Sequence, residues 1–363
     1  MPAIEVTHAT DGGLGYVAAV ADGERILVHV RHLANTGVST SQLFLLDQTG
    51  TAVARTSIPV RAPGGRIELA LTGTGSAALA VSTRDRSSAL REGIAPSDAY
   101  HWFRVEWPND RIKLTPLPSW THGQIWTQPP KLRSRGGTTL TICRDPRPEA
   151  AAGDLAFAVD GPIPPDRFTT IKVERPIGYD ACVIGHDHGL AAVNLDFHDV
   201  RLFELRPGLV RDIGTVSAKG QRRGETGDVR LLYQSNQVAV LWRYFNKRIR
   251  RTERDATLYL ARLDQGTLMP GPAVRLTADR EVTSWHLMDG ERGAVLLWKD
   301  GLSRRSQSVR LIEFSRLDAL PAEPVGFDQP YPEAAVETTI GRLAFSVEFT
   351  ATPYRWTLRA VDF

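Results

Sequence analysis

The residues of this chain whose types and spacing favour chemistry are few, and two histidines come first. In the segment GHDHG, His186 and His188 stand two positions apart. If this segment is a strand, both imidazoles point to one side, as the ligands of a metal ion must. Asp187, Asp196 and His198 are close in the sequence, so a third ligand is conceivable. The pair also falls at an expected hairpin turn, where such residues are common, and we therefore expect neither a metal nor another cofactor.

Evidence for nucleophilic or phosphate chemistry is weak. The sequence has no G-x-S-x-G elbow, and TGTGS from Thr72 is followed by no helix, so it is expected to be a hairpin turn. Cys143 and Cys182 lie in apolar strand patterns and are expected to be buried thiols without a disulfide. We therefore favour a protein that is not an enzyme.

Polar residues on the expected inner strands keep an enzyme open as the alternative. They are chemically mixed and form no recognisable ligand set: Glu68, Asp180, Arg230, His286 and Glu337. A hydrolase or lactonase-like enzyme working in a central channel would use positions of this kind. Carboxylates after third strands, at Asp47, Asp160 and Asp264, are better explained as turn formers.

Basic and aromatic residues between strands are the strongest candidates for a binding surface. The segment RYFNKRIRRTERD carries Tyr244, Arg248, Arg250 and Arg251, and KDGLSRRSQ carries the pair Arg304 and Arg305. Clustered cations attract an anionic partner. A protein partner is expected first, an anionic ligand or a glycan is an alternative, and nucleic acid stays open.

A second aromatic segment, PSWTHGQIWTQPPK from Pro118, contains Trp120, His122 and Trp126. It lies between two strand patterns and reads as a connection. Two tryptophans there could stack on a sugar ring, a base or a partner's side chain. A glycan-binding protein is therefore the second alternative function, and packing of the two rings over the fold is the competing interpretation.

These segments are positioned by a repeat of about fifty residues, a length typical of radial β-sheet arrays. Seven copies each contain an apolar strand closed by an acidic turn, for example SQLFLLDQTG from Ser41, DVRLFELRPG from Asp199 and ATLYLARLDQGT from Ala256. Asp-Gly, Gly-Gly and Ser-Asn pairs separate the strands, as hairpins require. No segment shows the apolar spacing and caps of a helix.

The repeat resembles the seven-bladed β-propeller superfamily over the whole chain, at the level of fold only. No GH…WD pair and no recurrent di-glycine ties it to a named repeat family. The resemblance implies an all-β protein of four-stranded antiparallel blades in one domain, residues 1–363. The expected blades span residues 15–60, 67–117, 125–174, 179–218, 228–277, 282–327 and 334–363, the last with 3–9. The alternatives are a six-bladed ring, with the weak third copy as an insertion, or paired β-sandwiches.

The last copy lacks a fourth strand, and AIEVTHA precedes the first copy as an orphan strand. We expect this N-terminal strand to pair in the last blade and close the ring, which leaves no exposed edge there. In such a ring, the loops between second and third strands and the connections between blades emerge on one face. The basic segments of the fifth and sixth copies would then share a surface with the tryptophan segment.

Composition argues against polyanion-coating, membrane-spanning and secreted proteins. The formal net charge is only +3, which argues against a protein that coats polyanions through its global charge. No apolar segment is long enough to span a membrane, and the N-terminus lacks the features of a secretory signal. With two cysteines, these observations favour a cytoplasmic protein.

Overall fold

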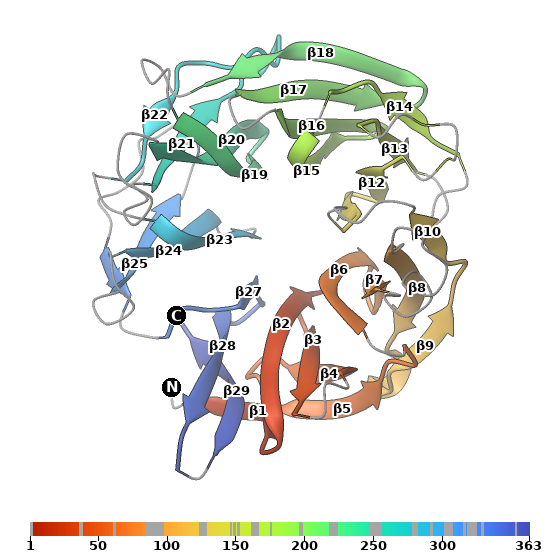
Figure 1. The fold of residues 1–363 in the computed structure, drawn as a ribbon, viewed down its shortest axis with the longest axis vertical. Helices are drawn as coiled ribbons and strands as arrows, with labels where there is room; N and C mark the ends of the chain where they lie inside the picture. The colour runs from red at the N-terminus through yellow and green to blue at the C-terminus, as the bar shows by residue number, and fades with distance from the viewer. Residues whose placement is uncertain are drawn as a thin grey trace. The chain divides into compact units, whose positions relative to one another are not determined.

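The computed structural model consists of antiparallel β-sheets (Figure 1). It describes residues 3–35, 39–60, 63–84, 98–122, 129–145, 147, 150, 153–160, 167–174, 176–195, 199–217, 224–246, 256–277, 282–290, 293–300, 308–314, 317, 325–327, 330–352 and 354–363. Within these ranges the helical segment is one 3-10 turn, Pro108–Asp110. No helix among the described residues is long and apolar enough to cross a lipid bilayer.

Two compact units divide the chain, and the first comprises residues 1–132, 161–166 and 332–363. It contains blades one, two and seven. Blade one is β2 (Gly12–Ala21), β3 (Arg25–Ala34), β4 (Ser39–Asp47) and β5 (Ala52–Ser57). Blade two is β6 (Pro63–Gly73), β7 (Ser76–Arg84), β8 (Asp98–Glu106), β9 (Lys113–Pro116) and β10 (Trp120–His122). Blade seven is β27 (Ala334–Glu337), β28 (Arg342–Thr350), β29 (Arg355–Asp362) and β1 (Ile4–Ala9).

The second unit comprises residues 133–160 and 167–331. Blade three is β11 (Lys131–Arg135), β12 (Thr138–Arg144), β13 (Leu155–Val159) and β14 (Thr169–Ile171), and blade four is β15 (Pro176–Gly185), β16 (His188–Leu195), β17 (Asp199–Arg206) and β18 (Leu209–Val216). Blade five is β19 (Gly224–Gln234), β20 (Gln237–Asn246), β21 (Ala256–Arg262) and β22 (Val274–Arg275). Blade six is β23 (Val282–Gly290), β24 (Gly293–Asp300), β25 (Ser308–Phe314) and β26 (Val325–Phe327).

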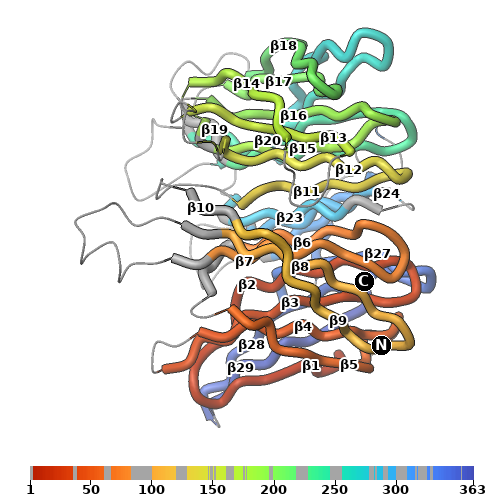
Figure 2. The backbone as a smooth tube through the Cα atoms, turned by 90° about the vertical axis from the view of Figure 1, so that its right-hand side faces the viewer, coloured from red at the N-terminus to blue at the C-terminus, as the bar shows by residue number. Residues whose placement is uncertain are grey.

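The N-terminal strand completes the last blade, as the sequence predicts. β1 is antiparallel to β29, with Ile4 opposite Ala360 and Ala9 opposite Trp356, and the two strands run side by side in both views (Figure 1, Figure 2). The seven sheets with this closure confirm the seven-bladed β-propeller fold. The third copy, the weakest in sequence, forms a blade of its own, so the six-bladed alternative is wrong.

Strands in the middle of each blade are buried on both faces. In β3, Ile26 and Val28 pack in one core cluster with Phe345 of blade seven, while Leu27 packs in another with Phe103 of blade two. β3 therefore contributes alternate side chains to two neighbouring cores. This explains why several strands read as continuous apolar runs rather than as strict alternation.

The acidic turns are built as the sequence predicts. The Oδ1 atom of Asp47 accepts the backbone N–H groups of Thr49 and Thr51, at 2.9 and 3.0 Å. Asp264 accepts those of Gly266 and Thr267 in the same way, at 3.0 and 2.8 Å. These bonds satisfy backbone donors where the strand has ended.

One polar side chain in blade one makes the fold sensitive to acid. His29 is completely buried, and its Nδ1–H donates to the carbonyl oxygen of Tyr16 at 3.2 Å. Burial lowers the pKa of His29 from 6.5 to about 4, and the bond to Tyr16 offsets only part of this effect. Because the folded pKa lies below the unfolded value, this contribution to stability is complete above pH 6.5 and is lost as the pH falls toward 4.

We expect His29→Asn to remove this acid sensitivity, because the Asn amide keeps a donor near Tyr16 and does not titrate. The parent protein should lose about 3 kcal/mol through His29 between neutral pH and pH 4. Urea unfolding gives the free energy of unfolding of both proteins at neutral pH and at pH 4. The contribution of His29 is the acid-induced loss in the parent minus the loss in the variant. His8→Asn, at a half-exposed imidazole, is the control and should follow the parent. An equal acid loss in His29→Asn would show that another group is responsible.

Candidate functional site

The basic segments of the fifth and sixth copies attach to the same end of two packed blades. The Gln234 amide, at the β19–β20 turn, donates to the carbonyl oxygen of Phe314 in blade six at 3.3 Å. Phe314 pairs with Ala294, beside the β23–β24 turn. The opposite ends of β20 and β24 border one core cluster, since it contains Ala256, which lies opposite Phe245 of β20, and Val282, which lies opposite Asp300 of β24.

Three segments leave or enter the blades at that end. Residues 247–255 follow β20, residues 301–307 follow β24, and residues 218–223 lead into β19, whose Gly224 lies opposite Asn246. We call this end of blades five and six the basic end. Arg248, Arg250, Arg251, Arg304 and Arg305 lie in these segments, outside the described residues.

The described cations next to the basic end are held against aromatic rings. The Arg243 guanidinium lies 4.6 Å from the centre of the Phe245 ring and donates from Nη2 to Asp228 at 3.0 Å. Lys299, near the end of β24, lies 4.7 Å from the centre of the Tyr331 ring. Such contacts order the cations without neutralising all of them.

The structure corrects the expectation for Tyr244. This residue is 3% exposed and packs edge-on against Tyr259, with the ring centres 6.2 Å apart. Side chains of β20 alternate between two blade cores, and the apolar ring of Tyr244 faces one of them. Tyr244 therefore belongs to the core and offers no surface to a partner.

The first part of the tryptophan segment, Trp120–His122, is a strand rather than a connection. β10 pairs with β8, with Trp120 opposite Tyr100 and His122 opposite Asp98. β9 covers only the other part of β8, from Phe103 to Glu106, which leaves the edge near Tyr100 open for β10. The side chains of Trp120 and His122, and all of Trp126, lie outside the described residues.

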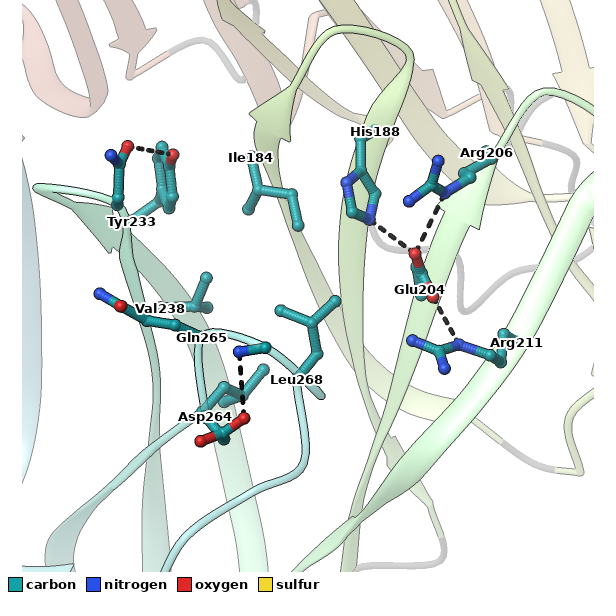
Figure 3. Close-up of a pocket in the computed structure, with 13 residues that line it drawn as sticks. Ile184, His188, Glu204, Arg206, Arg211, Tyr233, Val238, Asp264, Gln265 and Leu268 are labelled. Carbon is teal, nitrogen blue, oxygen red and sulfur yellow. Dashed lines mark hydrogen bonds and ion pairs between the residues drawn. The ribbon is translucent and has the colours of Figure 1, made fainter.

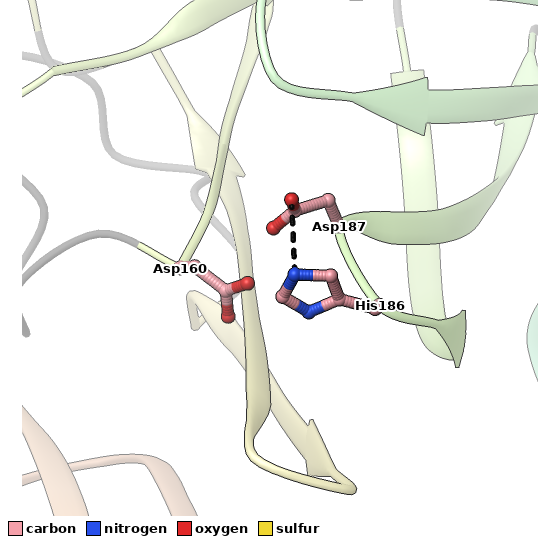
Figure 4. Close-up of side chains that lie close together, drawn as sticks. All are labelled: Asp160, His186 and Asp187. Atoms are coloured by element: carbon pink, nitrogen blue, oxygen red, sulfur yellow. Dashed lines mark ion pairs between the residues drawn. The ribbon is translucent and has the colours of Figure 1, made fainter.

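His186 and His188 do not point to a common side. Residues 186 and 187 form the hairpin turn, with Asp187 at a φ of 51°, and this interrupts the strand alternation on which the expectation rested. His188 faces Glu204, with Nε2 2.8 Å from Oε1. His186 instead lies beside Asp187 and near Asp160 of blade three (Figure 4).

Among the described residues, Asp160, His186 and Asp187 bring one imidazole and two carboxylates within 4.8 Å of one another. This donor set suits a borderline transition metal such as Zn²⁺. Burial raises the pKa of Asp160, and the neighbouring Asp187 carboxyl adds to this effect. Asp160 also accepts the Thr139 N–H at 2.7 Å, so it has a structural role as a turn former.

Two of the expected channel residues connect neighbouring blades. Glu68 of blade two accepts Lys131 Nζ at 3.0 Å and the Leu132 N–H at 3.2 Å, both from β11. Asp180 of blade four accepts Arg133 Nη2 at 2.8 Å and the Leu231 N–H of blade five at 2.9 Å. The first strand of a blade has an open edge, and these carboxylates satisfy its backbone donors.

The other three channel candidates have separate surroundings. Arg230 lies 5.7 Å from the centre of the Trp285 ring. Burial lowers the pKa of His286 to about 4, and the charge of Arg230 contributes. Glu337 pairs with Arg342 of its own blade at 3.6 Å. Glu68 and Asp180, by contrast, act as connectors between strands of neighbouring blades.

A pocket of about 290 Å³, which was not predicted from the sequence, lies between blades four and five (Figure 3). On the side of blade four, Glu204 accepts Arg206 Nε at 3.1 Å and Arg211 Nε at 2.5 Å. Tyr233 and Gln265 line the side of blade five. Glu204 and Arg211 stand opposite each other across the Pro207-Gly208 turn, so the hairpin pattern could have revealed this pair.

The charged side chains of the pocket wall are paired with one another. Burial alone would raise the pKa of Glu204, but the bonds from Arg206 and Arg211 outweigh it and hold this pKa below its usual value. Burial lowers the pKa of His188, and the charge of Arg206 acts in the same direction. Glu204 is therefore ionised and His188 neutral near pH 7.

Comparison with known proteins supports the fold and nothing narrower. No protein-family model matches the chain, and no curated protein sequence matches it. The β-propeller domain of the Trilobed protease from Pyrococcus furiosus has a TM-score of 0.56 at 9% identity, over 97% of both chains. Hydrazine synthase from Kuenenia stuttgartiensis has a TM-score of 0.54 at 12% identity, over 99% of both chains.

The chain is a seven-bladed β-propeller. At such low identities these likenesses carry no activity, ligand or partner to this propeller. Among the described parts of its own surface, the pocket and the strands next to the basic end have distinctive chemistry.

Proposed function

We propose that this propeller is a non-enzymatic binding or scaffolding module that holds an anionic partner, in the first place an acidic protein surface, at the basic end. One observation supports the proposal above all others. The Gln234–Phe314 hydrogen bond places the β19–β20 turn beside the β23–β24 end of blade six. The three basic segments consequently attach at one location.

Charge at this location is strongly one-sided. Residues 218–223, 247–255 and 301–307 contain ten lysines and arginines and two acidic residues. The whole chain has a net charge of only +3, so the excess is local. A local field of this kind accelerates and orients the approach of an anion.

A rigid base supports the charged segments. Leu241, Leu258, Leu296 and Trp298 of blades five and six share one core cluster, and all four are 3% exposed or less. Loops presented on such a frame lose little entropy in the frame itself when a partner binds. We favour a protein partner over nucleic acid because a modest net charge suits recognition of a limited acidic patch.

The triple variant Arg248→Ser, Arg250→Ser, Arg251→Ser tests the proposal. We expect its affinity for labelled poly-L-glutamate to fall by about tenfold or more, and the salt dependence of binding to become shallower. The free energy of unfolding should change by less than about 0.5 kcal/mol for each of the three substitutions. Fluorescence anisotropy at several salt concentrations measures the affinity.

The matched control replaces three exposed cations of blade two, Arg104, Arg111 and Lys113, by serine. It removes the same charge and should bind like the parent. Equal losses in both triple variants would mean that only net charge matters and would refute a localised site. Tighter binding of double-stranded DNA than of polyglutamate would overturn the preference for a protein partner.

A further inference from the structure

The pocket between blades four and five is separate from the basic end. It lies beside the β15–β16 and β19–β20 turns, whereas the basic segments attach at the far ends of β20 and β24. Neither the repeat nor the expected channel accounts for it. Its ligand therefore has to be inferred from the chemistry of its own walls.

The polar wall is a preformed row of donors. Arg206 and Arg211 each use Nε to bind Glu204, which is 6% exposed and fixes both guanidinium groups. The terminal guanidinium nitrogens of both arginines point into the pocket region (Figure 3). Guanidinium N–H groups donate well to hydroxyl oxygens, and Glu204 fixes their positions in advance.

The facing wall is apolar and aromatic, with an amide at its edge. Ile184, Val238 and Leu268 lie between the ionic cluster and Tyr233 (Figure 3). The Tyr233 ring is held by Arg135, whose guanidinium lies 4.2 Å from the ring centre, and the Tyr233 hydroxyl donates to Asn236 at 3.0 Å. Gln265 adds an amide that can both donate and accept.

The wall that carries Gln265 is a well-defined turn. Asp264 accepts the backbone N–H groups of Gly266 and Thr267 and also the Thr267 hydroxyl, at 3.0, 2.8 and 2.9 Å. All three bonds go to the Oδ1 atom of Asp264 and fix the conformation of the turn. The pocket is thus bounded on both sides by side chains held in place without a ligand.

Size and charge narrow the class of ligand. A volume of about 290 Å³ is at the small end for ligand sites, enough for one ring rather than a nucleotide. Two arginines and two carboxylates balance, which gives no net attraction for an ion. A ligand with an apolar face and an edge of hydroxyl groups matches the two kinds of wall.

We propose that this pocket binds a single monosaccharide unit, with its hydroxyl edge toward Arg206 and Arg211 and its apolar face toward Ile184, Val238 and Leu268. The unit is either a free sugar or the terminal residue of a glycan. The site stands independently of the proposed partner at the basic end.

Binding is tested with D-glucose, D-galactose, D-mannose, L-fucose and N-acetyl-D-glucosamine by ligand-observed NMR titration. At least one should bind the full chain with a millimolar or lower dissociation constant. Arg211→Gln, which loses guanidinium donors, and Gln265→Ala, which leaves the ion cluster intact, should each weaken it by about tenfold. A glycan array distinguishes the two sources. If the natural ligand is the terminal residue of a glycan, the protein should bind an immobilised glycan more strongly than the free sugar.

Arg201→Gln is the matched control. Arg201 lies on the same blade and pairs with Asp212 but does not line the pocket, so this variant should bind as the parent does. Absence of binding by all five sugars and by the array overturns the proposal. Unchanged binding in both pocket variants, or binding of acetate in preference to every neutral sugar, overturns it equally.

Discussion

Removal of residues 1–10 is expected to lower the free energy of unfolding by at least about 4 kcal/mol. β1 buries Val6 and Ala9 in the core shared by blades seven and one, and it covers Leu358, which is completely buried. Its loss also exposes the backbone edge of β29, from Ala360 to Trp356. Urea unfolding followed by tryptophan fluorescence measures the change.

Two companion experiments separate strand loss from lost surface charge. Glu5→Ala breaks the exposed ion pair with Arg355 and the exposed contact with His8, and should cost less than about 1 kcal/mol. A synthetic peptide of residues 1–12, added to the truncated protein, should restore most of the stability because it can pair with β29. A truncated protein as stable as the parent would contradict the role of β1 in the last blade.

Asp180→Ala is expected to destabilise the protein by about 3–5 kcal/mol. The carboxylate is 1% exposed and joins three blades by accepting bonds from Arg133 and from the Leu231 N–H. Without it, a buried backbone donor and a guanidinium lose an acceptor at once. Chemical denaturation reports the loss directly.

Two further substitutions set the scale for this prediction. Asp180→Asn keeps an acceptor for Leu231 but loses the charge, so its cost should be intermediate. Asp212→Asn affects an exposed carboxylate on the same blade that pairs with Arg201, and should cost less than about 1 kcal/mol. If Asp180→Ala and Asp180→Asn were as stable as Asp212→Asn, Asp180 would not be an essential connector between blades.

Much of the fold could be predicted because each blade is a local unit. Hairpins join residues close in sequence, so turns such as Gly136-Gly137 and Ser235-Asn236 follow from residues that favour positive φ. The missing fourth strand of the last copy indicated the pairing of β1 with β29. The fourth strand of blade two was harder, because β9 and β10 share the edge of β8 in two short pieces.

The candidate sites were less predictable, since each depends on contacts between blades. Tyr244 looked like a loop aromatic, but its burial depends on Tyr259 from the next strand and on the core of blade four. His188 looked like a partner of His186, and only the position of the hairpin turn separates them. The Glu204–Arg211 pair was accessible from the hairpin register, whereas the opposing wall with Gln265 was not.

By itself, the sequence determined the number of blades, the place of the N-terminal strand and the acidic turns, because strand periodicity and turn chemistry act over a few residues. The tertiary structure decided that Asp180 reaches Leu231, 51 positions away, and that Glu204 faces a loop of the next blade. These contacts between residues far apart in the sequence depend on how the sheets of neighbouring blades pack face to face. The sequence pattern does not show which side chains of neighbouring repeats pack together, because core and pocket residues occupy the same alternating strand positions.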